Sequence, residues 1–163
     1  MQKEFKYSMN AVAKDVISGF TGVIINRSAH LFGCAQYGLA PQELSTDGSP
    51  RKTEHFDEAR IEVVEDIDAL KEDNSYDSIF TIKLGTEVKD KVSGFEGKVL
   101  VIVENMNNCS QYYVEPPVDK EGKTRDGNWF DEGRLSVIGE GISPSEVAST
   151  KRGSVFSRDL PRV

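Results

Sequence analysis

Two pairs of adjacent carboxylates, Asp57-Glu58 and Asp131-Glu132, stand at equivalent places of a repeat in this chain of 163 residues. Two carboxylates can act as general acid and general base when both face one site. Neighbouring residues of a helical turn point in different directions, however, and the arginine three residues after each aspartate suits a local ion pair. We therefore expect both carboxylate pairs to close a structural turn, and we assign no catalytic residue.

Metal and cofactor chemistry has a poor supply of ligands in this sequence. The chain holds two histidines, His30 and His55, and two cysteines, Cys34 and Cys109, without the spacing of a metal site. A zinc site needs three or four nitrogen or sulfur ligands. No phosphate-binding loop, nucleophile elbow or dinucleotide fingerprint occurs either. We therefore expect neither a metal nor a cofactor.

The elements that must position these residues come in two copies. Residues between 14 and 63 recur at an offset of 75, or of 74 after a one-residue deletion. The seventeen identical pairs are Lys14/Lys89, Asp15/Asp90, Ser18/Ser93, Gly19/Gly94, Phe20/Phe95, Gly22/Gly97, Cys34/Cys109, Gln36/Gln111, Tyr37/Tyr112, Pro41/Pro116, Gly48/Gly122, Arg51/Arg125, Phe56/Phe130, Asp57/Asp131, Glu58/Glu132, Arg60/Arg134 and Val63/Val137. An ordered repeat of this kind indicates a duplicated structural unit. We divide the chain into a first, degenerate unit (1–64), an acidic linker (65–83), a second unit (84–138) and a C-terminal arm (139–163).

The second unit has the clearer strand pattern. Residues 88–92 and 109–115 alternate apolar and polar side chains, and residues 98–103 are aliphatic and β-branched. Two short segments, 129–130 and 135–138, flank a single helical turn. Five short strands joined by glycine-rich turns indicate a small closed β-barrel, and their order is that of an SH3-like barrel. The predicted fold is all-β, with two such barrels in tandem.

The linker and the arm have weaker patterns. Residues 66–73 fit a short helix, and residues 78–83 fit a strand that leads into the second barrel. Residues 144–150 fit a helix with Ser143 as its cap and Pro144 at its first position. The rest of the arm is predicted to be an extended segment that orders on a partner, with a frayed terminus as the alternative.

The charge of the chain is negative. The net charge is −7, and the linker alone carries six acidic and two basic residues. Neither unit has the basic surface that binding of a phosphate backbone requires, so nucleic-acid binding is disfavoured. No segment approaches the ~20 apolar residues of a membrane span, and residues 1–6 lack the apolar core of a signal peptide. We expect a protein made in the cytoplasm, without a membrane partner.

The two cysteines, Cys34 and Cys109, are equivalent residues of the repeat. A disulfide between them would require a close pseudo-twofold contact between the units. We expect two buried free thiols that act as small apolar residues.

Three aromatic residues of the second unit, Tyr112, Trp129 and Phe130, could form a contact surface. Tryptophan and tyrosine are enriched at interface hot spots, although the same side chains also fill cores. In the first unit His55 stands where the second has Trp129, so the second unit is the better candidate for contact. The candidate partner-binding residues are Tyr112, Trp129, Arg134 and, in the arm, Phe156.

The second unit resembles a small domain found in bacteriophage and prophage proteins. The motifs that carry the resemblance are Val88-Lys89-Asp90-Lys91-Val92-Ser93-Gly94-Phe95-Glu96-Gly97, Cys109-x-Gln111-Tyr112 and Trp129-Phe130-Asp131-Glu132-x-Arg134-Leu135. The leading strand and the glycine turn are also similar to the KOW type of SH3-like barrel. The phage resemblance implies an origin and not an activity, and the acidic surface argues against the RNA binding that a KOW barrel would imply.

We weigh two functions. The first is a virion structural protein (a minor capsid, decoration, head–tail joining or tail-associated component) whose partners are other virion proteins or further copies of itself. The tandem units and the extended arm suit such docking. The alternative is a soluble phage accessory protein that counters host defence by sequestering a signalling nucleotide or by binding a host protein, because aromatic side chains beside an arginine can stack a base and hold a phosphate.

Overall fold

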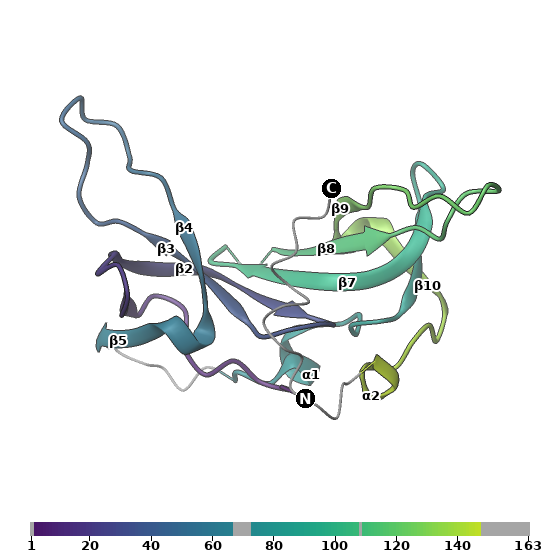
Figure 1. Ribbon diagram of the computed structural model, residues 1–163, viewed down its shortest axis with the longest axis horizontal. Helices are drawn as coiled ribbons and strands as arrows, with labels where there is room; N and C mark the ends of the chain where they lie inside the picture. The colour runs from purple at the N-terminus through teal and green to yellow at the C-terminus, as the bar shows by residue number, and fades with distance from the viewer. Residues whose placement is uncertain (1, 67–72, 108, 148–163) are drawn as a thin grey trace.

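The computed structural model describes residues 2–66, 73–107 and 109–147 (Figure 1). Its ten strands are β1 (Val12–Asp15), β2 (Thr21–His30), β3 (Gln36–Ala40), β4 (Glu54–Asp57), β5 (Ile61–Glu65), β6 (Glu87–Asp90), β7 (Glu96–Asn105), β8 (Ser110–Glu115), β9 (Asn128–Asp131) and β10 (Leu135–Gly139). Two 3-10 turns, η1 (Glu58–Arg60) and η2 (Glu132–Arg134), and two single-turn α-helices, α1 (Tyr76–Ile79) and α2 (Pro144–Val147), complete it. The all-β prediction is confirmed. Among the described residues no helix has the length and apolar character needed to cross a membrane.

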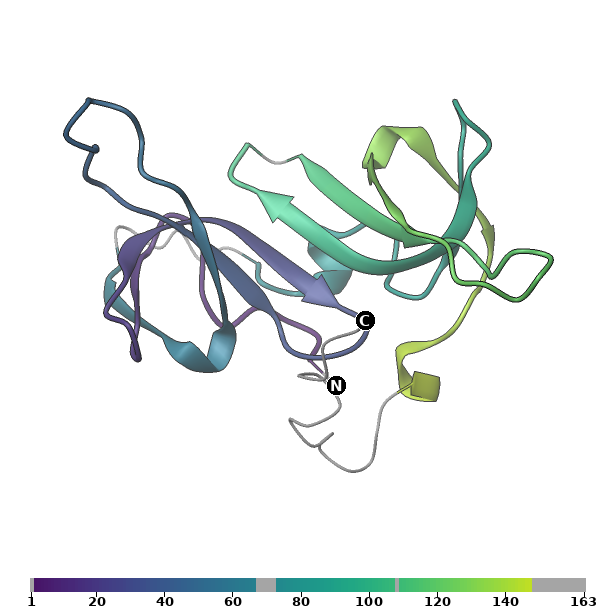
Figure 2. The same ribbon diagram turned by 45° about the horizontal axis from the view of Figure 1, so that its top comes forward.

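The ten strands form one antiparallel sheet whose two halves are connected in the same way (Figure 2). In the first half β1 pairs with β2 and β5, while β3 pairs with β2 and β4. In the second half β6 pairs with β7 and β10, while β8 pairs with β7 and β9. A 3-10 turn precedes the last strand of each half. The strands predicted for the second unit therefore match β6 to β10, and most of their ends differ from the prediction by one or two residues.

Two glycines explain how the first hairpin of each half turns so tightly. Gly19 and Gly94 have φ angles of 78° and 80°, which side chains rarely adopt. Gly22 and Gly97 pack against the neighbouring strand, since a Cβ atom would come within 2.5 Å of the Ala40 carbonyl oxygen and 2.2 Å of that of Glu115.

The segment before the second half differs from its prediction. The backbone of residues 76–79 forms α1, because Ile79 N donates to Ser75 O and Phe80 N donates to Tyr76 O. The strand predicted at 78–83 is therefore wrong, and Phe80 and Ile82 instead enter the core from a loop. Most of the helix predicted at 66–73 lies outside the described residues. The arm begins as predicted, with α2 at Pro144–Val147, and residues 148–150 lie outside the described part.

A single hydrophobic core runs through both halves. Phe5 and Phe80 are spaced by the same 75 residues as the repeat, and both are almost fully buried. Their ring centroids are 6.1 Å apart in an edge-to-face arrangement, which is a favoured geometry for aromatic pairs. The repeat thus begins before Lys14/Lys89, the first of the seventeen pairs. The equivalent residues Phe5 and Phe80 contact each other where the two halves join.

The two halves are joined by β2 and β7, which are equivalent strands of the repeat and pair with each other antiparallel. Ser28 pairs with Val103, and these two residues are themselves 75 positions apart. The flanking pairs are symmetric about this point, since Arg27 pairs with Glu104 and Ala29 with Ile102. The junction is therefore isologous, with a pseudo-twofold axis close to Ser28 and Val103.

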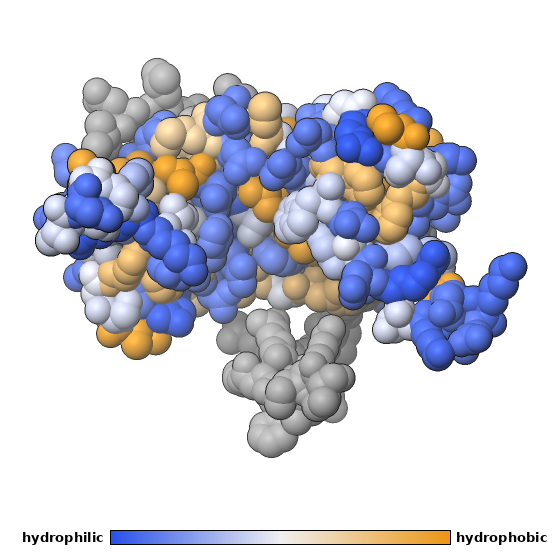
Figure 3. All heavy atoms as spheres, turned by 90° about the horizontal axis from the view of Figure 1, so that it is seen from above, coloured by the Kyte–Doolittle hydropathy of each residue, from blue (hydrophilic) through white to orange (hydrophobic). Residues whose placement is uncertain are grey.

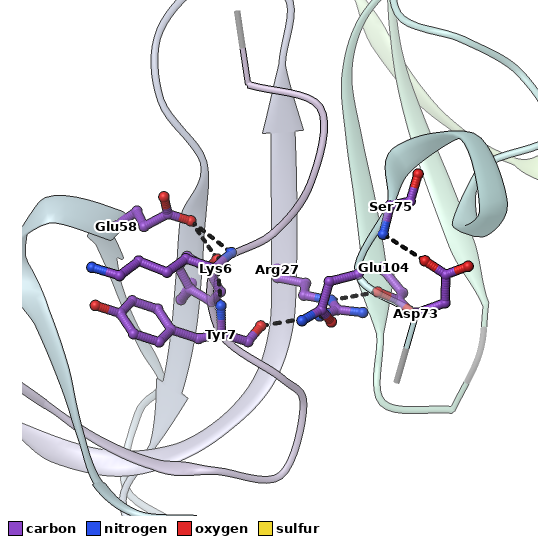
Figure 4. Close-up of polar contacts among 9 residues, drawn as sticks. Lys6, Tyr7, Arg27, Glu58, Asp73, Ser75 and Glu104 are labelled. Carbon is purple, nitrogen blue, oxygen red and sulfur yellow. Dashed lines mark hydrogen bonds and ion pairs between the residues drawn. The ribbon is translucent and has the colours of Figure 1, made fainter. Parts of the chain in front are cut away.

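One buried charge breaks this symmetry (Figure 4). Arg27 is 1% exposed, and its Nε lies 2.6 Å from Glu104 Oε2 across the junction. Its Nη1 donates to the Tyr7 carbonyl at 3.0 Å and to Asn74 Oδ1 at 2.7 Å, and its guanidinium carbon lies 4.6 Å from the centre of the Phe5 ring. A buried charge is tolerated only when it is paired and hydrogen-bonded, and Arg27 meets both conditions.

We expect Arg27→Met to lower the free energy of unfolding by about 3–5 kcal/mol, because removing one member of a buried pair leaves the other uncompensated. Urea denaturation measures this change. The control is Lys14→Met, which removes the exposed pair that Lys14 forms with Glu62 and should cost less than about 1 kcal/mol. Equal stabilities of the two variants would contradict the role given to Arg27.

Candidate functional site

The most polar buried group of the second half is Asp90, the last residue of β6, which is fully buried. Arg134 of η2 binds it through two hydrogen bonds, from Nε to Oδ1 at 2.9 Å and from Nη2 to Oδ2 at 2.6 Å. Ser93 adds bonds from its backbone nitrogen at 2.9 Å and from its hydroxyl at 2.5 Å. The first and last strands of the half are thereby tied together.

The first half repeats this arrangement with Asp15, Ser18 and Arg60, and its two arginine bonds measure 2.9 and 2.8 Å. Both arginines therefore bind the aspartate of the first strand. Neither arginine makes the expected ion pair with the aspartate three residues earlier in the chain. The hydrogen bond to Asp15 raises the pKa of Arg60, and the more distant charge of Asp57 adds to this effect. We call Asp15–Arg60 and Asp90–Arg134 the two Asp–Arg clamps.

The clamps are suited to structure rather than to proton transfer. The hydrogen bonds from Arg60 hold the pKa of the Asp15 carboxyl well below its usual range, against the opposing effect of burial. Arg134 does the same for the pKa of Asp90. A carboxylate with so low a pKa stays ionised near neutral pH and is a poor general base.

The adjacent carboxylates of the first half, Asp57 and Glu58, also serve the structure. In the first pair, Asp57 accepts a hydrogen bond from Gln36 Nε2 at 2.9 Å, which ties β4 to β3. Glu58 points elsewhere, accepting from Gln2 Nε2 at 2.8 Å and from the Tyr37 hydroxyl at 2.5 Å. Burial, followed by the bond to Glu58, raises the pKa of Tyr37 above its ordinary value. The two carboxylates do not share a site.

The histidines and cysteines are also dispersed. Within residues 2–66, 73–107 and 109–147, no three His, Cys, Asp or Glu side chains are grouped to hold a metal ion. Burial lowers the pKa of His30, whose Nε2 lies 2.9 Å from the Ser28 hydroxyl. The two cysteines were expected to be buried, but Cys34 is only partly buried and Cys109 is exposed. The halves do share a pseudo-twofold contact, but its paired residues are those of β2 and β7.

The strand register separates the aromatic candidates into two groups. Tyr112 pairs with Phe130, and both face the core with exposures of 0% and 8%. Tyr113 pairs with Trp129 on the opposite face, where Trp129 is 49% exposed. The two outer rings have centroids 5.3 Å apart and an interplanar angle of 59°. Tyr112 is therefore a core residue in this structure. The residue beside Trp129 is Tyr113, and not Tyr112 as the sequence analysis suggested.

The Trp129–Tyr113 pair belongs to the second half alone. The equivalent positions of the first half hold Gly38 and His55, which also pair with each other. Gly127 allows the preceding loop to approach the aromatic pair, since a Cβ atom there would lie 2.6 Å from the Tyr113 ring. The sequence did carry a signal for Tyr113, because strict alternation along β8 sends Tyr112 and Tyr113 to opposite faces.

The other two candidate residues stand apart from this pair. Arg134 is engaged by Asp90, and its guanidinium carbon lies 5.5 Å from the centre of the buried Phe130 ring. Its place is thus within the clamp. Phe156 lies outside the described residues.

A pocket of about 300 Å³ lies where the N-terminal segment, α1 and α2 come together beside β7. Its apolar lining includes Tyr76, Phe80, Leu84 and Ile102, and Lys3 and Lys83 also contribute to it. Lys83 is paired with Asp77 at 3.3 Å. The base of this pocket suits an apolar group.

Comparison of the chain with protein-family models, with curated proteins and with solved structures finds no match. Among the candidate residues of the second half, the exposed Trp129 stands out with its neighbour Tyr113 from side chains that serve the fold.

The clamps predict a loss of stability in acid. Because the folded-state pKa values of Asp15 and Asp90 lie below the unfolded value of about 3.9, their contribution is fully present above pH ~4 and is lost as pH falls towards the folded values. We expect Asp90→Asn to be less stable than the wild type at pH 7 and to lose less stability between pH 5 and pH 2.5, as measured by urea denaturation. Lys89→Met, which removes an exposed ion pair with Glu96, should behave like the wild type. An acid loss in Asp90→Asn equal to that of the wild type would contradict the assignment.

Trp129 is the single tryptophan of the chain, so its fluorescence reports on this surface directly. We expect red-shifted emission and efficient quenching by acrylamide, because nearly half of the side chain is exposed. Tyr113→Ala should increase the quenching further by removing the ring that lies against the indole. Blue-shifted emission that resists acrylamide would place the indole in the core instead.

Proposed function

We propose that this protein is a structural component of a bacteriophage virion, as a minor capsid, decoration, head–tail joining or tail-associated protein, and that it acts through protein–protein contacts. The observation that carries the contact proposal is the exposed Trp129, held against Tyr113 on the outer face of β8 and β9. A large aromatic side chain that is fixed by a neighbour binds a partner at low entropic cost. The virion assignment itself draws on the resemblance of the second unit to phage proteins.

The finer architecture that we propose is two SH3-like barrels in tandem. In each half the strands are ordered with the last beside the first, followed by the second, third and fourth. The 3-10 turn before the last strand supports the same proposal. Two copies of one scaffold, of which only the second carries the aromatic pair, suit a protein that uses one unit for contact and the other for support.

Charge favours a protein partner over a nucleotide or nucleic acid. The net charge of −7 repels phosphate. The arginines of the second half are already occupied: Arg134 binds Asp90, and Arg125 donates from both Nε and Nη2 to the Pro117 carbonyl. A phosphate beside Trp129 would have to replace these contacts.

Quantitative mass spectrometry of purified virions tests the proposal. We expect the protein at a defined copy number in wild-type particles. Trp129→Ala should lower that number at least about tenfold, because truncation of a hot-spot residue costs 2 kcal/mol or more. His55→Ala is the matched control at the equivalent position of the first half and should leave the copy number unchanged.

Two outcomes would count against the proposal in different ways. Absence of the protein from virions, together with its presence in the soluble fraction of infected cells, would favour the accessory protein instead. Wild-type incorporation of Trp129→Ala would keep the virion role but remove Trp129 as the contact residue.

A further inference from the structure

Strand β10 forms one end of the sheet and has an unusual composition for an edge (Figure 1). Among the described residues it pairs only with β6. Its sequence, Leu135-Ser136-Val137-Ile138-Gly139, contains no charged residue, and Val137 and Ile138 are 59% and 46% exposed. Apolar side chains reach the surface on both halves of the molecule (Figure 3). Edge strands are normally protected by charges, so an uncharged apolar edge indicates a surface that is covered by a partner.

The backbone of β10 is oriented to accept another strand. Lys91 N donates to Arg134 O at 2.8 Å, which places Arg134 at a hydrogen-bonded position of the ladder with β6. In an antiparallel ladder these positions alternate, so Ser136 also faces β6 while Leu135 and Val137 direct their backbone groups outward. The Leu135 nitrogen donates to Glu132 O within η2. The backbone N–H and C=O of Val137 are thus directed toward the open edge.

The equivalent strand β5 is protected where β10 is not. It carries Glu62 and Glu65, and the Tyr7 hydroxyl donates at 2.8 Å to the carbonyl of Ile61, the residue equivalent to Leu135. The residue 75 positions after Tyr7 is Ile82, which has no hydroxyl to donate. The open edge is therefore specific to the second half.

We propose that β10 pairs antiparallel with β10 of a second copy of this chain, centred on Val137, and forms a symmetric homodimer. In this register the two Val137 residues exchange both backbone hydrogen bonds, and Ser136 of each copy lies opposite Ile138 of the other. Arg134 and Glu140 lie just outside this strand, and Arg134 is already bound to Asp90. The paired segment Leu135–Gly139 is uncharged, so no like charges oppose each other across the new ladder.

The chain already uses this kind of contact internally. Strands β2 and β7 pair antiparallel at equivalent residues, and the proposed dimer applies the same isologous arrangement to β10. An isologous contact closes at two copies, so the assembly does not grow further through this edge. The inference does not depend on the virion role, because it concerns only this chain and its own copy.

Light scattering coupled to size-exclusion chromatography of the full chain tests the proposal. We expect a concentration-dependent shift from 18.1 kDa to twice that mass. Val137→Lys should shift the equilibrium towards the monomer by about fivefold, because the symmetry sets the two lysines directly opposite each other and like charges there cost up to about 1 kcal/mol. Val63→Lys in β5 is the matched control and should dimerise like the wild type. Circular dichroism verifies that both variants are folded.

A second variant tests the register. Val137→Cys, in a background that also carries Cys109→Ser, should form an intermolecular disulfide on mild oxidation, because directly opposed residues of a ladder lie within bridging distance. Val63→Cys in the same background should remain largely monomeric on a non-reducing gel.

Three results would overturn the proposal. These are a wild-type protein that stays monomeric at all concentrations, a dimer that Val137→Lys leaves intact, and species that grow beyond the dimer with concentration. The last result would indicate pairing of β10 with a different edge of the next copy.

Discussion

The antiparallel pairing of β2 with β7 joins two similarly connected halves into one sheet, and it brings Phe5 and Phe80 together in a common core. It also buries Arg27, whose charge is satisfied by Glu104, Asn74 and the Tyr7 carbonyl. Units of about 55 residues are marginal alone, and this junction lets each half share the core of the other.

Much of the fold could be predicted from local sequence patterns. Alternation along residues 109–115 and the glycine turns located the strands of the second half, and the repeat extended them to the first. The segment 76–84 was predicted incorrectly, because the spacing of Phe80 and Ile82 resembles that of a strand although both residues enter the core from a loop. The Asp90–Arg134 contact was missed because sequence spacing shows ion pairs within a helix but not between a strand and a turn 44 residues apart.

The candidate surface was predicted in part. Trp129 is exposed, as a contact residue must be, but the candidate Tyr112 is buried in the core, and Tyr113, which was not a candidate, lies beside Trp129. Strand phase decides between adjacent tyrosines, and it becomes certain only when the partner strand is known, here through the pairing of Tyr113 with Trp129. Arg134 could not be assigned correctly without Asp90, because an arginine near aromatic residues resembles a ligand contact until its own partner is seen.

The Asp–Arg clamps also bear on how the chain is made. Each clamp joins the first strand of a half to the turn before its last strand, across 45 residues in the first half and 44 in the second. During synthesis the carboxylate of β1 or β6 therefore emerges from the ribosome long before its arginine, and the half cannot complete its fold until the final strand has followed. Long-range closure of this kind slows folding, so each half passes through a period in which its buried aspartate is still hydrated and its core still open.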